Sequence, residues 1–205
     1  GWDVSINYLY HYLDRPVLEQ TLQANQLSIT PRYERSHLLG GTFSNAFGSY
    51  TVRGEVALHS KLFFLIDSTL ANNNVTENSI NSFINSKSGV ASSPTLETVF
   101  GLDYNGITDT FISGQLFISH IIDYDTPLTR EQNDMTVTLL VDRNFYNETL
   151  TVSGQWFHNL NDGDGLTRIS VEYELRSNII IISGGIDSFY GERKGIFGQY
   201  DQRDQ

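Results

Sequence analysis

Apolar and polar residues alternate with a period of two along much of the chain, and segment 50–59 shows this most clearly. Tyr50, Val52, Gly54, Val56 and Leu58 form one set of positions, and the intervening set is mostly polar or charged. Successive side chains of a β-strand point to opposite faces, so this segment predicts a strand with one apolar and one polar face. Segments 149–156 and 168–175 alternate in the same way.

Period-two segments bounded by turn residues predict about nine strands and part of a tenth. Most are longer than the usual strand of about 5–6 residues and match the roughly 9–11 residues that cross a bilayer at a tilt. The predicted strands are 2–12, 27–44, 49–63, 95–105, 110–122, 134–144, 149–159, 166–176 and 178–189, with a last strand starting near 197.

The predicted connections alternate between short and long. The short ones are 45–48, 105–109, 144–148 and 176–177, and the others are 13–26, 65–94, 123–133, 160–165 and 190–196. Segment 160–165 is short, although the alternation predicts a long connection at this point. An up-and-down barrel with small turns at one end and larger loops at the other produces this alternation. The polar segment 65–94 is predicted to be a long, mobile outer loop, and a plug inside the lumen is the alternative.

Aromatic residues support a membrane barrel. Trp2, Tyr8, Tyr10 and Tyr12 share one face of the first predicted strand, with aliphatic Val4 and Ile6 between the rings. Amphipathic rings favour the two interfaces of a bilayer. We therefore predict an all-β fold, an antiparallel up-and-down transmembrane β-barrel. Residues 1–205 form a single barrel segment with about ten strands, as part of a larger barrel. A soluble β-sandwich or adhesin-like binding module is the alternative, because its strands alternate too.

Composition narrows the class further. Hydrophobic residues make up 39% of the chain, and no run approaches the roughly 20 apolar residues of a transmembrane helix. The absence of cysteine excludes disulfides and thiolate metal sites, and the net charge of −11 argues against a nucleic-acid partner. We expect no metal and no cofactor. We expect that these residues include no signal peptide and that both ends are truncated.

Charged and polar side chains on the predicted polar faces are the candidates for lining a lumen. Charges of both signs there favour a polar solute or set ion selectivity, and mutual neutralisation by cross-strand ion pairs is the alternative. The candidate residues are Arg53, Glu55, His59, Lys61, Ser119, Asp142, Gln155, Arg168, Glu172 and Glu174.

Two other kinds of chemistry were weighed from the residues. A Ser/His site of an outer-membrane lipid hydrolase would use His37 with Ser44, or the pair Ser119-His120. His37 and Ser44 fall on opposite faces, however, over 20 Å apart at about 3.3 Å per residue. The segment Asp162-Gly163-Asp164-Gly165 resembles a fragment of a calcium loop, but it lacks the further spaced ligands, and Asp-Gly is also an ordinary hairpin turn.

Three stretches together resemble the C-terminal part of a proteobacterial outer-membrane family of unknown function. They are 36–57 (SHLLGGTFS, then FG and VRGEVA), 101–117 (GLDY, then FISGQLF) and 195–201 (GIFGQYD). The family is predicted to form porin-like barrels, and its genes tend to lie beside those of lipid-carrier-like periplasmic proteins and resistance-nodulation-division exporters. In this family a final strand normally follows the segment 201–204.

The resemblance assigns no catalytic residue. It implies a bacterial outer-membrane location, contact with membrane lipid and lipopolysaccharide, and periplasmic lipid-carrier or exporter proteins as partners. We therefore expect a non-enzymatic porin-like channel, or the outer component of an export system, for a small or hydrophobic solute.

Overall fold

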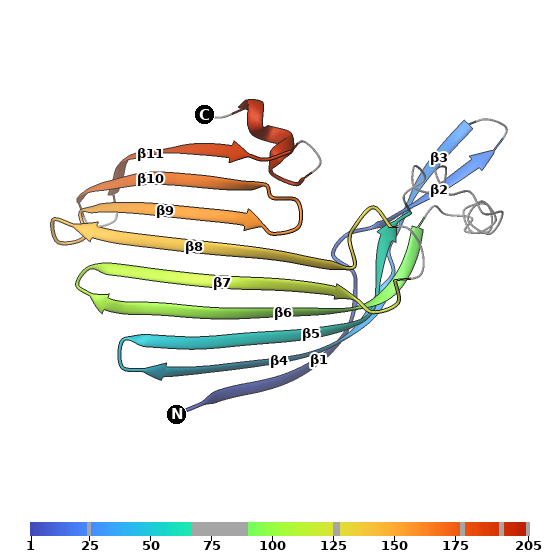
Figure 1. Cartoon of the computed structure of the whole chain (residues 1–205), viewed down its shortest axis with the longest axis horizontal. Helices are drawn as coiled ribbons and strands as arrows, with labels where there is room; N and C mark the ends of the chain where they lie inside the picture. Colours follow the sequence, from blue (N-terminus) through green and yellow to red (C-terminus); the bar gives the residue numbers. More distant parts are fainter. Residues whose placement is uncertain (24–25, 67–89, 125–127, 177–178, 193–194, 204–205) are drawn as a thin grey trace.

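The protein is an antiparallel nine-stranded sheet with a separate two-stranded ribbon (Figure 1). The computed structural model describes residues 1–23, 26–66, 90–124, 128–176, 179–192 and 195–203. The sheet order is β1-β4-β5-β6-β7-β8-β9-β10-β11. Its strands are β1 (Asp3–Tyr12), β4 (Arg35–Phe47), β5 (Tyr50–Leu65), β6 (Val90–Ile107), β7 (Thr110–Ile121), β8 (Asn133–Phe145), β9 (Leu150–Asn159), β10 (Gly165–Arg176) and β11 (Ile179–Tyr190).

Neighbours in this sheet follow one another along the chain, apart from the ribbon inserted between β1 and β4, so the predicted all-β meander is confirmed. The β4–β5, β6–β7 and β8–β9 turns are short and lie at one end of the sheet (left in Figure 1). Positive φ angles at Gly48, Asp109 and three consecutive residues from Tyr146 make these reversals tight. The longer connections lie at the opposite end, which we call the loop end.

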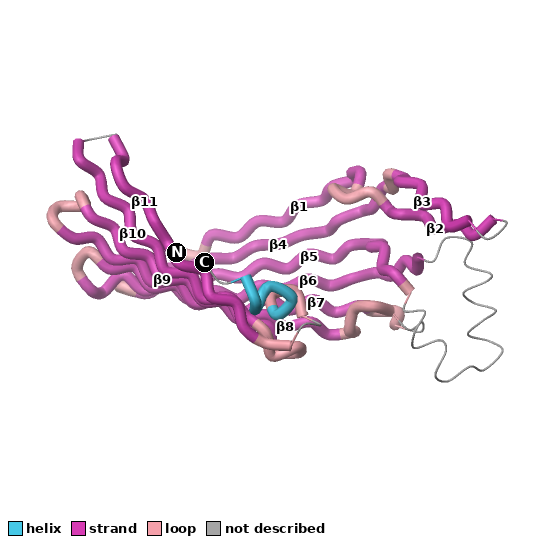
Figure 2. Tube along the Cα trace, turned by 90° about the horizontal axis from the view of Figure 1, so that it is seen from above, coloured by secondary structure: helices cyan, strands magenta, loops and turns pink. Residues whose placement is uncertain are grey.

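The sheet is open, so the described part of this chain does not close into a barrel by itself. It twists and curves, and β1 and β11 form its two edges (Figure 2). No pairing joins these two strands in the part of the chain that the structure describes. The strand pattern predicted the meander, but alternation along a strand carries no information about which edges meet.

The predicted strand 27–44 is wrong, because the chain breaks at Tyr33 and Glu34. β3 (Gln26–Arg32) pairs with β2 (Val17–Gln23) in a ribbon that projects beyond the loop end (Figure 1). Glu34 fixes the corner: its backbone oxygen accepts the Leu13 N–H at 2.8 Å, and its carboxylate binds Arg32 and Lys61. Alternation runs across this corner, so the sequence pattern did not reveal it.

β5 and β6 extend further towards the loop end than predicted. The register between them shifts by one residue where Ser60 and Lys61 oppose Pro94. Proline has no N–H to donate, and a bulge is one of the few places where a sheet tolerates it. Beyond the bulge a small cluster forms around Phe64, Ile121 and Leu128. Of the predicted loop 65–94, residues 67–89 lie outside the described part, whereas 90–94 belong to β6.

The last predicted strand, near 197, is also wrong. Gly198–Arg203 forms a 3₁₀ helix, η1, rather than a strand. The carboxylate of buried Asp164 accepts the N–H groups of Phe197 and Gly198 at 2.6 and 3.0 Å. Phe197 also contacts Phe157, and Tyr200 contacts Phe189. These contacts satisfy the first free N–H groups of the helix and hold the segment against β9 to β11.

None of the described residues forms a helix with the length and hydropathy needed to cross a membrane.

Candidate functional site

In the observed register, apolar positions of neighbouring strands lie opposite one another, and so do polar positions. The sheet therefore has one mainly apolar and one mainly polar face. In the regularly paired parts, one face carries the even-numbered residues of β1, β5, β6, β7, β9 and β11 and the odd-numbered residues of β4, β8 and β10. We call this the apolar face and the opposite one the polar face. In these paired parts, every Asp and Glu lies on the polar face.

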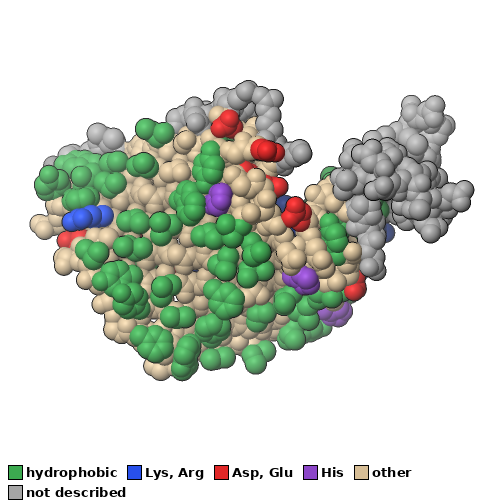
Figure 3. Space-filling model, in the orientation of Figure 1, with side chains coloured by type: hydrophobic (Ala, Val, Ile, Leu, Met, Phe, Trp, Pro, Cys, Tyr) green, Lys and Arg blue, Asp and Glu red, His purple; other side chains and the backbone are tan. Residues whose placement is uncertain are grey.

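No layer formed by the described residues covers the apolar face of the sheet. Hydrophobic side chains are spread over this face in the space-filling view (Figure 3). Ile6 on one edge strand is 82% exposed and Ile186 on the other is 65% exposed, and Leu102 and Leu139 in the central strands are about half exposed. The few buried apolar side chains, such as Phe64 and Ile121, lie near the loop end. A sheet normally buries its apolar face against a second layer, and the described residues supply none here.

Aromatic rings gather near the two ends of this face. Trp2 contacts Phe43 and Phe47 near the short turns, where Tyr50 also pairs with Tyr104. At the loop end the rings are Tyr8, Tyr10, Tyr12, His37, Trp156, His158 and Tyr190. The middle is mainly aliphatic, with Phe100 as an exception.

The two arginines of the apolar face, Arg35 and Arg143, lie near strand ends and beside aromatic rings. The Arg35 guanidinium carbon lies 4.3 Å from the centre of the Tyr12 ring, and that of Arg143 lies 5.1 Å from the centre of the Phe145 ring. A guanidinium at a strand end reaches polar surroundings while its methylenes cover apolar surface. The centre of the face therefore carries no fixed charge.

Rings lie across two glycines of the apolar face. A Cβ at Gly54 would overlap the Phe43 ring, and one at Gly165 would overlap Tyr190. The Tyr190 hydroxyl accepts the Trp156 indole N–H at 2.8 Å and lies 3.0 Å from His158 Nδ1. Aromatic side chains that cover strand glycines help to fix the register of a sheet.

The predicted residue Arg53 is held by an ion pair on the polar face. Its Nε lies 3.1 Å from Asp103 Oδ2, and its Nη2 donates to Ser113 Oγ at 3.3 Å. Gly101 on β6 pairs with Arg53 in the sheet register. Because glycine has no Cβ, it leaves room for the arginine side chain. His59 Nε2 lies 3.2 Å from Glu97 Oε2, a contact that becomes a second ion pair when the imidazole is protonated.

Arg168 forms the third ion pair of the polar face, with Asp187. Both distances are 2.6 Å, from Nε to Oδ1 and from Nη2 to Oδ2. Cross-strand contacts with carboxylates, the alternative to free lumen-lining charges, are therefore found for Arg53, His59 and Arg168. No ion-pair partner among the described residues is found for Glu55, Asp142 or Glu172, which lie on the same face.

The other predicted residues lie in varied surroundings. Gln155 pairs with Arg168 in the sheet register, and Ser119 Oγ is buried with no hydrogen-bond partner in the described chain. Lys61 lies in the bulge, and its side chain binds Glu34 near the loop end instead of lying beside Arg53 and Glu55. Glu174 lies at a register shift, where its N–H donates to Thr149 O at 2.8 Å.

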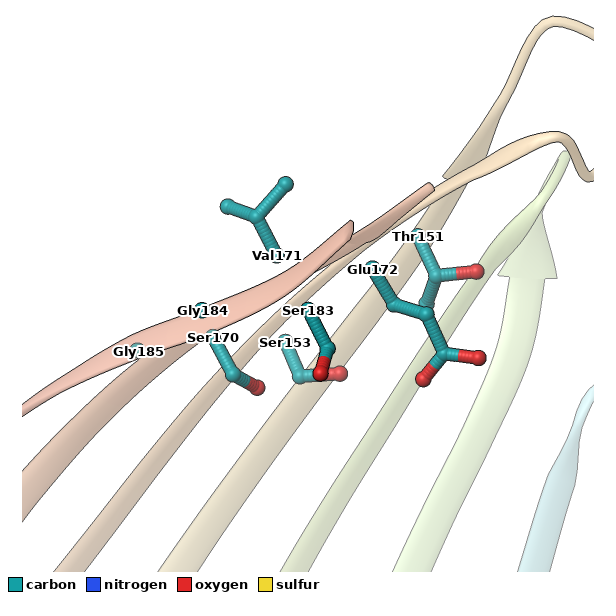
Figure 4. Close-up of a pocket in the computed structure, with 8 residues that line it drawn as sticks. All are labelled: Thr151, Ser153, Ser170, Val171, Glu172, Ser183, Gly184 and Gly185. Carbon is teal, nitrogen blue, oxygen red and sulfur yellow. The ribbon is translucent and has the colours of Figure 1, made fainter. Parts of the chain in front are cut away.

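A shallow hollow of about 330 Å³ lies on the polar face over β9, β10 and β11 (Figure 4). In the close-up, Thr151, Ser153, Ser170, Ser183 and Glu172 project to one side of the sheet, and Val171 points to the other. Gly184 and Gly185 complete the lining. Among the described side chains, no basic one lines this hollow.

The structure does not bring together a serine and a histidine as the alternative of a lipid hydrolase requires. Ser119 and His120 occupy opposite faces, and so do His37 and Ser44. His37 Nδ1 lies 2.6 Å from the Tyr8 hydroxyl, and His120 Nδ1 lies 2.7 Å from Asn133 Oδ1. Within the described residues, no serine hydroxyl is hydrogen-bonded to a histidine ring.

The contacts of the Asp162–Gly165 turn stabilise the fold. Asp164 binds the backbone of the C-terminal segment, and no group of three or more histidine or acidic side chains in the described residues could hold a metal ion. Partial burial, with Asp164, Glu131 and Asp134 nearby, raises the pKa of Asp162.

Sequence reasoning missed the partners of the polar face: Asp103, Ser113, Glu97 and Asp187. Each lies on a period-two position, so alternation placed it on the correct face. Which strands are adjacent, and in what register, was the information needed to pair it with Arg53, His59 or Arg168.

Comparison of the chain with protein-family models, curated proteins and solved structures found no match.

Proposed function

We propose that this chain forms part of the wall of a porin-like β-barrel in a bacterial outer membrane, with its apolar face towards lipid and its polar face towards a lumen. The observation that supports this most strongly is the uncovered apolar face, which continues across nine strands and carries no carboxylate in the paired parts. A small or hydrophobic solute passing along the polar face is the transport function that follows.

The physical reason is the cost of leaving this face in water. The largest apolar patch of a soluble monomer is about 300–600 Å², and larger ones mark an interaction surface. Lipid tails offer apolar contact over the whole width of a sheet, without the need for a shaped partner.

The ends of the apolar face favour a bilayer over a second protein sheet. Rings near both strand ends, and arginines beside them, match the interfacial girdles of membrane barrels. The strand length fits too, since ten residues at roughly 3.3 Å each and a tilt of about 40° span about 25 Å. A sandwich core has no reason to keep tyrosines and arginines at its margins.

The open edges set one requirement. In lipid the free N–H and C=O groups of β1 and β11 would cost several kcal/mol each, so the wall must be closed. The proposed barrel is completed by strands beyond these nine, from the same polypeptide or from other copies. Membrane lipid and lipopolysaccharide are then its immediate surroundings, and lipid-carrier or exporter proteins are its proposed periplasmic partners.

Gel mobility of the detergent-extracted full-length protein, boiled against unboiled, tests the barrel. We expect the unboiled protein to migrate differently, because a closed barrel resists detergent. A single mobility, with folded protein in the soluble fraction, contradicts the proposal and favours the sandwich.

Tryptophan fluorescence tests the facing. Trp2 and Trp156 both lie at the apolar face, Trp2 near the short turns and Trp156 towards the loop end. In vesicles, lipid with bromine near the headgroup should quench the single-tryptophan variant Trp156→Phe more strongly than lipid with bromine at the chain terminus. Quenching by aqueous iodide alone would place Trp2 in water and contradict the assignment.

A further inference from the structure

The polar face has more negative than positive groups, and its positive groups are already neutralised. In the regularly paired strands its arginines are Arg53 and Arg168, and each binds a carboxylate. Its carboxylates are Asp3, Glu55, Glu97, Asp103, Asp134, Asp142, Glu172 and Asp187.

Four of these carboxylates remain without a cationic partner in the described part of the chain: Asp3, Glu55, Asp142 and Glu172. They are distributed over β1, β5, β8 and β10, so the excess charge crosses the sheet rather than forming one cluster. Asp142 Oδ1 is buried and has no hydrogen-bond partner among the described atoms.

The hollow around Glu172 supplies only oxygen ligands from its side chains. Thr151 and Ser183 flank Glu172 across the strands, and Ser153 pairs with Ser170 in the neighbouring row. Hydroxyl and carboxylate oxygens suit an ammonium group or an alkali-metal cation, whereas an anion would meet the Glu172 charge with no basic side chain to offset it.

We propose that the polar face selects cations and that Glu172, in its hydroxyl-lined hollow, is a contact point on their path. This rests on the proposed function, because it requires the polar face to line a lumen. A lumen lined by one sign of charge raises the local concentration of counter-ions. Arg53 and Arg168 do not oppose this preference, since their carboxylate partners cancel their charge.

The test is the reversal potential of the full-length protein in planar lipid bilayers under a tenfold KCl gradient. We expect a permeability for K⁺ several-fold higher than for Cl⁻. Glu172→Gln should lower this ratio, and the triple variant Glu55→Gln, Asp142→Asn, Glu172→Gln should bring it close to one. Asp109→Asn is the matched control, because it removes one carboxylate from a turn outside the polar face, at a positive φ that asparagine tolerates.

The outcomes separate the two proposals. Channels that prefer Cl⁻ overturn cation selection. A K⁺ preference that is unchanged in the triple variant overturns the role of Glu55, Asp142 and Glu172. Both outcomes leave the barrel standing. A heat-modifiable protein without conductance overturns the open lumen and the selectivity with it. An equal loss of K⁺ preference in Asp109→Asn would place the selecting charge in the turns and overturn the role of Glu172.

Discussion

The two faces of this sheet are made by the same strands, yet they differ in what satisfies them. Side chains on the polar face satisfy one another across strands, as Arg53 and Asp103 do, or Arg168 and Asp187. Side chains on the apolar face are partly to largely exposed, and the ring contacts that stabilise it from within lie near its ends. The polar face therefore meets part of its own requirements through cross-strand ion pairs, although Asp3, Glu55, Asp142 and Glu172 have no cationic partner among the described residues. The apolar face depends on its surroundings.

The largest difference between the faces is expected from placing the same charge on each. Val56→Arg puts a guanidinium in the middle of the apolar face and should destabilise the membrane-inserted protein by about 2–4 kcal/mol. Glu55→Arg is the matched control, one residue away on the polar face and without an ion-pair partner among the described residues. Denaturant unfolding in lipid vesicles measures both, and equal losses would contradict the assignment of the faces.

A smaller effect is expected from filling the glycine beneath an aromatic ring. Gly54→Ala should cost about 1–3 kcal/mol, because its methyl group displaces the Phe43 ring. Gly114→Ala lies on the same face and meets nothing within 4 Å, so it should be close to neutral. Denaturant midpoints for the two variants check this, and a comparable loss in both would mean that the ring contact does not set the cost.

The hydroxyl of Tyr190 joins two strands at the loop end of the apolar face. Tyr190→Phe removes the acceptor for the Trp156 indole and the contact with His158, and should cost about 1 kcal/mol. Tyr146→Phe, in an exposed turn, is its control. The same unfolding measurement should show a loss for Tyr190→Phe alone.

The smallest effect concerns Asp162, which belongs to neither face. Its pKa is raised by partial burial and by nearby carboxylates, so ionisation disfavours the folded state. The penalty is absent at pH values below the unfolded pKa and is fully present above the folded pKa. Asp162→Asn should therefore raise the thermal midpoint slightly at pH 7 and leave it unchanged at pH 3. A shift of equal size at both pH values would exclude the carboxylate charge as the cause.

Alternation predicted the faces, because side-chain direction follows directly from strand geometry. It failed where a tertiary contact changes the path of the chain. Glu34 turns the chain between β3 and β4 by binding Lys61, and Asp164 makes a helix of Gly198–Arg203 by accepting backbone N–H groups. Both partners are distant in sequence.

For the candidate site too, the sequence predicted the face on which most residues lie but not their partners. Arg53, Glu55 and Glu172 lie on one face as their positions indicated, whereas the bulge opposite Pro94 removes Lys61 from that set. The distinction between paired and unpaired carboxylates, on which the proposed selectivity depends, needs the register of neighbouring strands.

The odd number of strands in the meander has a consequence for any ring built from it. Because neighbours alternate in direction, the first and ninth strands of the sheet run the same way. Joining β1 directly to β11 would create a single parallel seam, which is slightly weaker per residue than an antiparallel pair. A ring in which every neighbour is antiparallel needs an odd number of additional strands. An odd total strand count therefore requires at least one such seam, and a ring built only from copies of this nine-stranded sheet would have one at every junction.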